Sequence, residues 1–238
     1  MHRTRLRFHG AIAGVGTQSG VRIVVGHWPR SPFGAVGDVM VEKPDGHRLL
    51  VAAAPALAQF VAATYAFDEV RVAPVAITAG DDAWTVAAGP LELRFRVGRR
   101  GWLGVLLRSV PAPLTRLPAW SAVLDLPARL VLPGVRTRGT AGGGRREWYG
   151  VQDLRPIVDV TARLDGCDLG PLAPVRPPVR FGFASTPRRP AVVRVTTTVE
   201  VPEFEGGPRR PGTPPRQAGA ADAGGYGRRR RGGEHLCS

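Results

Sequence analysis

The run GGGRREWYG, residues 142–150, contains residue types that often bind small ligands. Backbone N–H groups of consecutive glycines form concave anion-binding sites, and the guanidinium groups of Arg145 and Arg146 would add charge-assisted hydrogen bonds. Trp148 supplies a flat apolar surface beside these charges, as small-molecule sites often do. This run is therefore the first candidate for a binding site.

Alternation along the strand expected after this run indicates which side chains point inward. Its apolar face carries Val158, Val160, Ala162 and Leu164. If the register continues back through Pro156, then Arg146, Trp148 and Gln152 share that inward face. Buried Arg and Gln side chains need polar partners, which a ligand can provide. The alternative is a β-bulge near Pro156, which would reverse the face.

Single residues elsewhere offer further chemistry. Trp28 ends an apolar strand, where it either lines the rim of a cavity or packs as a core aromatic. The EKPDG turn around Lys43 favours a solvated charge over a Schiff-base nucleophile. Glu147 and Asp153 would suit acid–base chemistry, yet alternation places both opposite Trp148, so no catalytic residue is predicted. The predicted ligand-binding residues are Arg145, Arg146, Trp148, Gln152 and Trp28.

The glycine-rich run GAIAGVGTQSG, residues 10–20, comes close to the G-x-G-x-x-G fingerprint of a dinucleotide site. That fingerprint requires a helix after the glycines, because the helix N-terminus holds the pyrophosphate. Here the glycines precede VRIVVGHWPRSP, a β-branched segment interrupted by Pro29 and Pro32, which favours a strand. The glycines therefore indicate a bend, a bulge or close packing within a curved strand pair.

The spacing of the histidines and the net charge of the chain indicate which metals, cofactors and macromolecular partners to expect. The five histidines lack metal-site spacing, so we expect neither a metal nor a cofactor. The formal charge of +14 would suit a nucleic acid or an anionic membrane. However, Lys43 is the single lysine among 33 basic residues, a bias typical of GC-rich genomes that raises Arg content everywhere. Nucleic acid is therefore not the expected partner.

Short alternating and β-branched segments separated by Gly and Pro indicate a mostly β fold. We predict an antiparallel barrel or a strongly curved double sheet with two short helical insertions, residues 55–67 and 102–135. The alternatives are a β-sandwich and an α+β fold. Among the expected strands are EVRVAPVAIT (residues 69–78) and VRFGFAS (residues 179–185).

Composition divides the chain into two parts. Residues 1–201 are expected to form a single globular β-rich domain, and the Arg-, Gly- and Pro-rich residues 202–238 a disordered tail. No apolar run reaches the ~18 residues of a membrane-spanning helix, so a cytoplasmic location is expected. The apolar residues 102–135 leave peripheral membrane contact open, and the oligomeric state is undetermined.

Four segments carry a resemblance to other proteins: SPFGAVGDVMVEKPDGHRLLVA, ATYAFDEVRV, VRTRGTAGGGRREWYG and LGPLAPVRPPVRFGFASTPRRP. Together with the composition, they resemble a group of uncharacterised proteins from high-GC actinobacteria. The resemblance covers roughly Arg5 to Val201 and leaves out the tail. The group has no assigned activity, so the resemblance implies a bacterial origin and one globular unit, and no catalytic residues.

Three functions remain open at the level of sequence. The first is a barrel-like protein that binds a small apolar or anionic ligand in an interior cavity. The second is an enzyme that acts on a lipophilic substrate in that cavity, which requires a titratable residue inside it. The third is an accessory protein that associates with a membrane surface or nucleic acid through Arg-rich segments.

Overall fold

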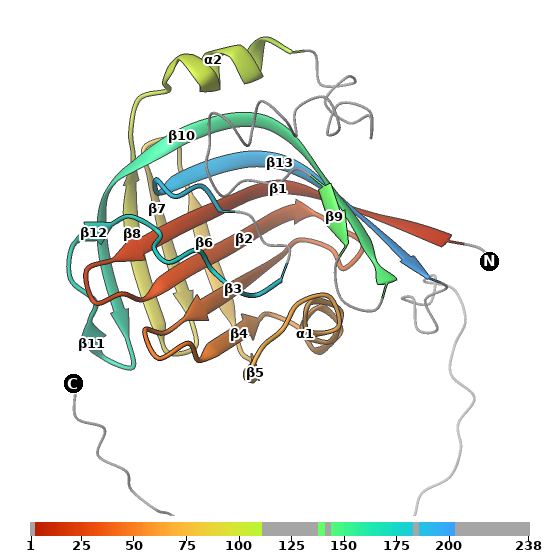
Figure 1. The fold of residues 1–238 in the computed structure, drawn as a ribbon, viewed down its shortest axis with the longest axis horizontal. Coiled ribbons are helices and arrows are strands. Elements are labelled where there is room, and N and C mark those ends of the chain that lie inside the picture. The colour runs from red at the N-terminus through yellow and green to blue at the C-terminus, as the bar shows by residue number, and fades with distance from the viewer. Residues whose placement is uncertain (1–2, 111–137, 141–143, 183–185, 203–238) are drawn as a thin grey trace, which may run out of the picture. The chain divides into compact units, whose positions relative to one another are not determined.

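The computed structural model describes residues 3–110, 138–140, 144–182 and 186–202, most of them in β-strands (Figure 1). The strands are β1 (Arg3–Thr17), β2 (Arg22–Arg30), β3 (Val36–Glu42), β4 (Arg48–Ala52), β5 (Glu69–Val72), β6 (Val75–Ala79), β7 (Ala83–Ala88), β8 (Leu91–Val97), β9 (Arg138–Thr140), β10 (Arg146–Leu164), β11 (Cys167–Asp168), β12 (Leu172–Ala173) and β13 (Ala191–Pro202). The described helices are α1 (Pro55–Ala62) and α2 (Trp102–Ser109). At eight residues each, neither could cross the apolar core of a bilayer.

All of these strands belong to one sheet, whose main path runs β5-β4-β3-β2-β1-β13-β10-β8-β7-β6. Neighbours pair antiparallel, except that β4 and β5 are parallel. Strand β10 joins the two halves, because Arg146 to Pro156 pair with β13 and Ile157 to Leu164 pair with β8. Figure 1 shows β10 arching over the sheet between these halves. The prediction of a mostly β, strongly curved antiparallel sheet with short helices is confirmed.

Strand alternation gives the sheet two apolar faces, and both are buried. Odd-numbered residues of β1 to β4, such as Val15 and Ile23, pack against β6 to β8 and the second half of β10. Even-numbered residues of the same strands, such as Phe8 and Leu50, pack against α1 and residues 175–181. The second face holds the pocket described below.

Two predicted strands differ from the observed structure. The segment 69–78 is split into β5 and β6, because Pro74 lacks the N–H that a continuous strand would need. Residues 179–182 form no strand; instead Val179 and Phe181 anchor this irregular segment in the core. Residues 183–185 lie outside the described residues.

Both predicted helical insertions contain a helix, although each helix is shorter than its segment. Helix α1 ends at Ala62, and Leu57, Phe60 and Val61 form its buried face as the spacing indicates. Helix α2 begins at the start of the second insertion, but residues 111–135 lie outside the described residues. After Pro202, the same holds for the predicted tail, so the domain division stays a prediction.

The glycine-rich run lies in β1 and the turn after it, so its interpretation as a strand pair is confirmed. The pairing of β1 with β2 shifts register between His9 and Ala11. A Cβ at Gly14 would lie 1.9 Å from Thr186 Cγ2, and one at Gly16 would lie 2.5 Å from the Pro174 carbonyl oxygen. These glycines therefore let Thr186 and the backbone of Ala173 and Pro174 pack directly on the β1 backbone.

We expect Gly14→Ala to lower the free energy of unfolding by roughly 1–3 kcal/mol, because its methyl group would overpack against Thr186. Thr186→Ser removes the opposing Cγ2 methyl, so the double variant Gly14→Ala/Thr186→Ser should recover most of that loss. Urea denaturation of the wild type, the two single variants and the double variant gives the coupling free energy between positions 14 and 186. Purely additive losses would contradict close packing between these two residues.

Candidate functional site

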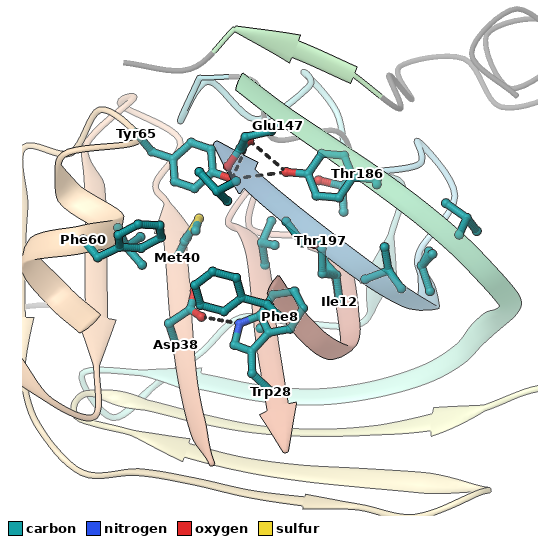
Figure 2. A pocket seen from close by; sticks show the side chains of 18 of the residues that line it. Phe8, Ile12, Trp28, Asp38, Met40, Phe60, Tyr65, Glu147, Thr186 and Thr197 are labelled. Atoms are coloured by element: carbon teal, nitrogen blue, oxygen red, sulfur yellow. Dashed lines mark hydrogen bonds between the residues drawn. The ribbon is translucent and has the colours of Figure 1, made fainter. Parts of the chain in front are cut away.

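A pocket of about 110 Å³ lies on the second face of the sheet, between α1 and the strands β1, β2, β3, β13 and β10. Its walls are mainly aliphatic and aromatic, and include Phe8, Ile12, Met40, Phe60 and Val195. The polar side chains in the lining are Trp28, Asp38, Tyr65, Glu147, Tyr149, Thr186 and Thr197. These polar groups form two hydrogen-bonded clusters and two isolated hydroxyls (Figure 2).

The first cluster joins Glu147 and Tyr149 of β10 to Tyr65, which follows α1. The Tyr65 hydroxyl donates to Glu147, with its oxygen 2.8 Å from Oε1 and 2.9 Å from Oε2. It also lies 3.1 Å from the Tyr149 hydroxyl, whose own distance to Glu147 Oε2 is 3.3 Å. Glu147 is only 1% exposed, so its hydrogen bonds come from within the protein.

Proton counting indicates how this cluster titrates. Three contacts join the three groups, but the phenols of Tyr65 and Tyr149 supply only two protons. Protonation of Glu147 provides the third and closes a ring of hydrogen bonds. Burial raises the pKa of Glu147 to about 7, although both phenols and Arg145 oppose the shift. Burial, followed by the Glu147 charge, also raises the pKa of both tyrosines.

The second cluster is a hydrogen bond from Trp28 Nε1 of β2 to Asp38 Oδ1 of β3, 2.9 Å long. A Cβ at Gly26 would approach Asp38 Oδ1 to 2.5 Å and Trp28 Nε1 to 2.6 Å, so this bond requires glycine beneath it. Burial raises the pKa of Asp38 to about 6, and the hydrogen bond from Trp28 partly offsets the shift. Burial thus raises the pKa of both carboxyl groups in the pocket.

Thr186 and Thr197 present the isolated hydroxyls. Both residues are buried, and neither Oγ1 atom has a hydrogen-bond partner among the described residues. Leaving a buried hydroxyl unpaired costs about 1–3 kcal/mol, so such groups usually have an occupant that satisfies them. Both residues line the pocket, so these hydroxyls are available to hydrogen-bond with a molecule that enters it.

Among the predicted ligand-binding residues, Trp28 lines the pocket. The three β10 residues that were predicted to point inward, Arg146, Trp148 and Gln152, do not. Arg146 is exposed. Trp148 is half-buried, and the Arg5 guanidinium carbon lies over its ring, 6.0 Å from the ring centre. Gln152 donates to Thr196 at 2.9 Å. These three side chains are thus absent from the pocket lining, which takes the intervening residues of the strand instead.

Strand β10 changes register twice. Its pairing with β13 shifts between Val151 and Asp153, and its pairing with β8 shifts between Ile157 and Asp159. Each shift moves the alternation by one residue, so Val158 is 50% exposed while Ile157 is buried. The expected inward position of Val158 is therefore wrong. Over the length of β10 the two shifts cancel, so Trp148 lies on the same sheet face as Val160, whereas the pocket lies on the opposite face with Tyr149.

The remaining candidates lie around the pocket or away from it. Arg145 donates to the Phe60 carbonyl oxygen at 2.8 Å and to Thr64, with its guanidinium 4.9 Å from the Phe60 ring centre. Burial lowers the pKa of Arg145, and the charge of Glu147 opposes that shift. Lys43 precedes the β3–β4 turn, as expected, and Asp153 pairs with Arg100 at 2.8 Å.

Sequence reasoning missed Glu147, Tyr65 and Asp38 as a group in one pocket. Two signals were present in the sequence. Asp38 interrupts the apolar strand VGDVMVE two positions before Met40, so both side chains point to the same face, and Glu147 and Tyr149 share a face for the same reason. An acid on the apolar side of a strand indicates a buried carboxyl group that needs partners. Only the fold brings Tyr65 within reach of both strands.

We expect the stability of the fold to depend on pH through Glu147. Its pKa is raised from 4.5 to about 7, so its contribution is complete below pH 4.5 and is lost as the pH rises through 7. Glu147→Gln removes this titration, so the variant should gain on the order of 2–3 kcal/mol relative to wild type between pH 4.5 and 8. Denaturant unfolding at stepped pH measures the difference.

The matched control for this titration is Glu92→Gln, which changes an exposed carboxylate on β8. Its stability relative to wild type should not change over the same pH range. If Glu147→Gln and wild type showed parallel pH profiles, Glu147 would have an ordinary titration and the hydrogen-bonded ring described above would be wrong.

Comparison with known proteins gives little functional information. No family model and no curated protein matches the chain. Among solved structures, the chain is similar to an acetoacetate decarboxylase from Legionella pneumophila, with 11% sequence identity over 83% of this chain and 84% of that one. The TM-score is 0.38, which is too low to assign this chain to a family or to transfer an activity.

Proposed function

We propose that the protein binds a small, largely apolar molecule in the pocket between α1 and the curved sheet. The observation that carries this proposal is the pair of buried Thr186 and Thr197 hydroxyls, which line an apolar pocket without a partner among the described residues. A bound molecule with one polar end would satisfy these hydroxyls and fill the space above the sheet.

The walls favour an apolar body for this molecule. Ile12, Met40, Leu57 and Val195 surround the space with aliphatic side chains, and Phe8 and Phe60 add aromatic rings. Contact with such walls stabilises an alkyl chain by about 0.8 kcal/mol for each buried CH₂ group.

The charges of the lining argue against an anionic molecule. Asp38 and Glu147 are both acidic, and no Arg, Lys or His is present among the residues that line the pocket. An anion there would meet at least one carboxylate above pH 6 without a compensating cation. We therefore narrow the expectation of an apolar or anionic ligand to one that is neutral or positively charged.

An enzyme that acts on a lipophilic substrate is the second candidate, and one specific observation favours it. The pocket contains two carboxyl groups whose pKa values burial raises toward neutrality, to about 6 for Asp38 and about 7 for Glu147. Such a pair can divide the roles of base and acid in proton transfer. If turnover of a lipophilic substrate is found, Asp38→Asn and Glu147→Gln should each reduce it about 10²-fold or more.

The third candidate, an accessory protein at a membrane or nucleic acid surface, rests chiefly on residues 102–135 and 202–238. Within the described part of the first segment, α2 exposes Trp102, Val105 and Leu106 on one side. The described residues carry no observation that identifies a partner for this side of the helix, so the third candidate stays a prediction.

Native mass spectrometry of freshly purified full-length protein tests the binding proposal. We expect an adduct that is released on collisional activation. Thr197→Val replaces the hydroxyl with a methyl group of similar size, so it should weaken ligand retention roughly tenfold while leaving stability unchanged or slightly higher. Thr198→Val is the matched control, because its side chain alternates to the opposite face of β13.

Two results would contradict the proposal. The first is the repeated absence of any adduct, together with no uptake of an added apolar probe such as 1-hexanol. The second is equal loss of ligand from the Thr197 and Thr198 variants, because only Thr197 lines the pocket.

A further inference from the structure

Asp38 has one carboxylate oxygen with no donor among the described residues. Its Oδ1 atom accepts the indole N–H of Trp28 at 2.9 Å, but no described side chain or backbone N–H donates to Oδ2. The residue is 4% exposed and lines the pocket, and Oδ2 is not among the fully buried polar atoms, so it is accessible to a molecule in the pocket. A buried carboxylate in this position needs a donor, and a charged donor stabilises it most.

Aromatic rings stand on the same side of the pocket as Asp38. Phe8 contacts Trp28 edge-on with ring centres 5.6 Å apart, and it stacks on Phe60 at 5.5 Å. Figure 2 shows Phe8, Trp28 and Asp38 together, apart from Tyr65 and Glu147. Aromatic faces attract cations within about 6 Å of the ring centre. The guanidinium of Arg145 already makes such a cation–π contact with the Phe60 ring.

The other charged and titratable groups around the pocket leave Asp38 as its uncompensated anion. Glu147 is held in the hydrogen-bonded ring with Tyr65 and Tyr149. The charge of Arg145 acts on Glu147, but Arg145 donates to Phe60 and Thr64 and does not line the pocket. The charge of Asp38 also acts on Tyr149, which places both clusters in one electrostatic environment.

We propose that the molecule bound here is an aliphatic amine in its ammonium form, with an N–H group donating to Asp38 Oδ2 and its alkyl chain lying along the apolar wall. This inference rests on the binding function proposed above and specifies its ligand class. The Trp28 and Phe8 rings flank the cationic end, and the Thr197 hydroxyl is an available acceptor. An ammonium ion satisfies the carboxylate by both charge and hydrogen bonding.

The same arrangement predicts how binding depends on pH. Burial raises the pKa of Asp38 to about 6, so the side chain is ionised at pH 7.5 and mostly protonated at pH 5. An alkylamine remains cationic at both values, since its pKa is close to that of lysine. The preference for the cation should therefore be strong at pH 7.5 and shrink at pH 5.

Three probes with the same six-carbon chain test the ligand class: hexylamine, 1-hexanol and hexanoate. In titration calorimetry with the full-length protein at pH 7.5, hexylamine should bind about tenfold or more tightly than 1-hexanol, and hexanoate most weakly. This ranking needs only wild-type protein, so it decides the proposal even if a variant fails to fold.

Asp38→Asn keeps the shape of the side chain and removes its charge. We expect it to abolish the preference for hexylamine and to leave the affinity for 1-hexanol within about threefold of wild type. Asp159→Asn is the matched control, because that carboxylate is exposed on β10 and pairs with Arg96 at 3.6 Å. It should retain the wild-type ranking.

The outcomes separate this inference from the function on which it rests. If 1-hexanol or hexanoate binds as tightly as hexylamine, or if the preference survives in Asp38→Asn, the ammonium assignment is overturned and the binding pocket stands. If none of the probes binds and no adduct copurifies, the binding function itself is overturned.

Discussion

Strand β10 is the element on which the rest of the structure depends, because it pairs with both halves of the sheet. Its first eleven residues, from Arg146 to Pro156, continue the ladder of β13, and the rest join β8. Two register shifts in β10 accommodate the bend of the sheet between the two ladders. The curl brings β6 to β8 against one face of β1 to β4 and leaves the other face to α1.

The pocket follows from this two-sided burial. The second face is covered by one short helix and an irregular segment, which are anchored by Leu57, Phe181 and a few neighbours. Such a cover fills the space less completely than a second layer of strands, so a pocket remains above β1, β2 and β13. The polar groups in it are expensive to bury, and the protein satisfies most of them internally. Those left without partners among the described residues, Asp38 Oδ2 and two threonine hydroxyls, are the basis of the proposed ligand binding.

Much of the fold was predictable from local pattern. The perfect alternation of LELRFRV reappears as β8, with every second residue buried, and Pro55 begins α1 as expected. The glycine-rich run was correctly assigned to a bent strand, because the β-branched residues after it could not form a helix. The candidate site was predictable only in part: Trp28 lines the pocket, whereas Arg146, Trp148 and Gln152 do not.

The sequence by itself determined the β class, the turns and the apolar faces, since these depend on backbone propensity and on neighbours one or two residues away. Tertiary structure alone decided which acids are buried together. Tyr65 and Glu147 are 82 positions apart in the chain, and their hydrogen bond exists because the sheet curls beneath α1. Alternation has a period of two, so one register shift exchanges the faces of a strand, and no local pattern in REWYGVQDLRP announces where that shift occurs.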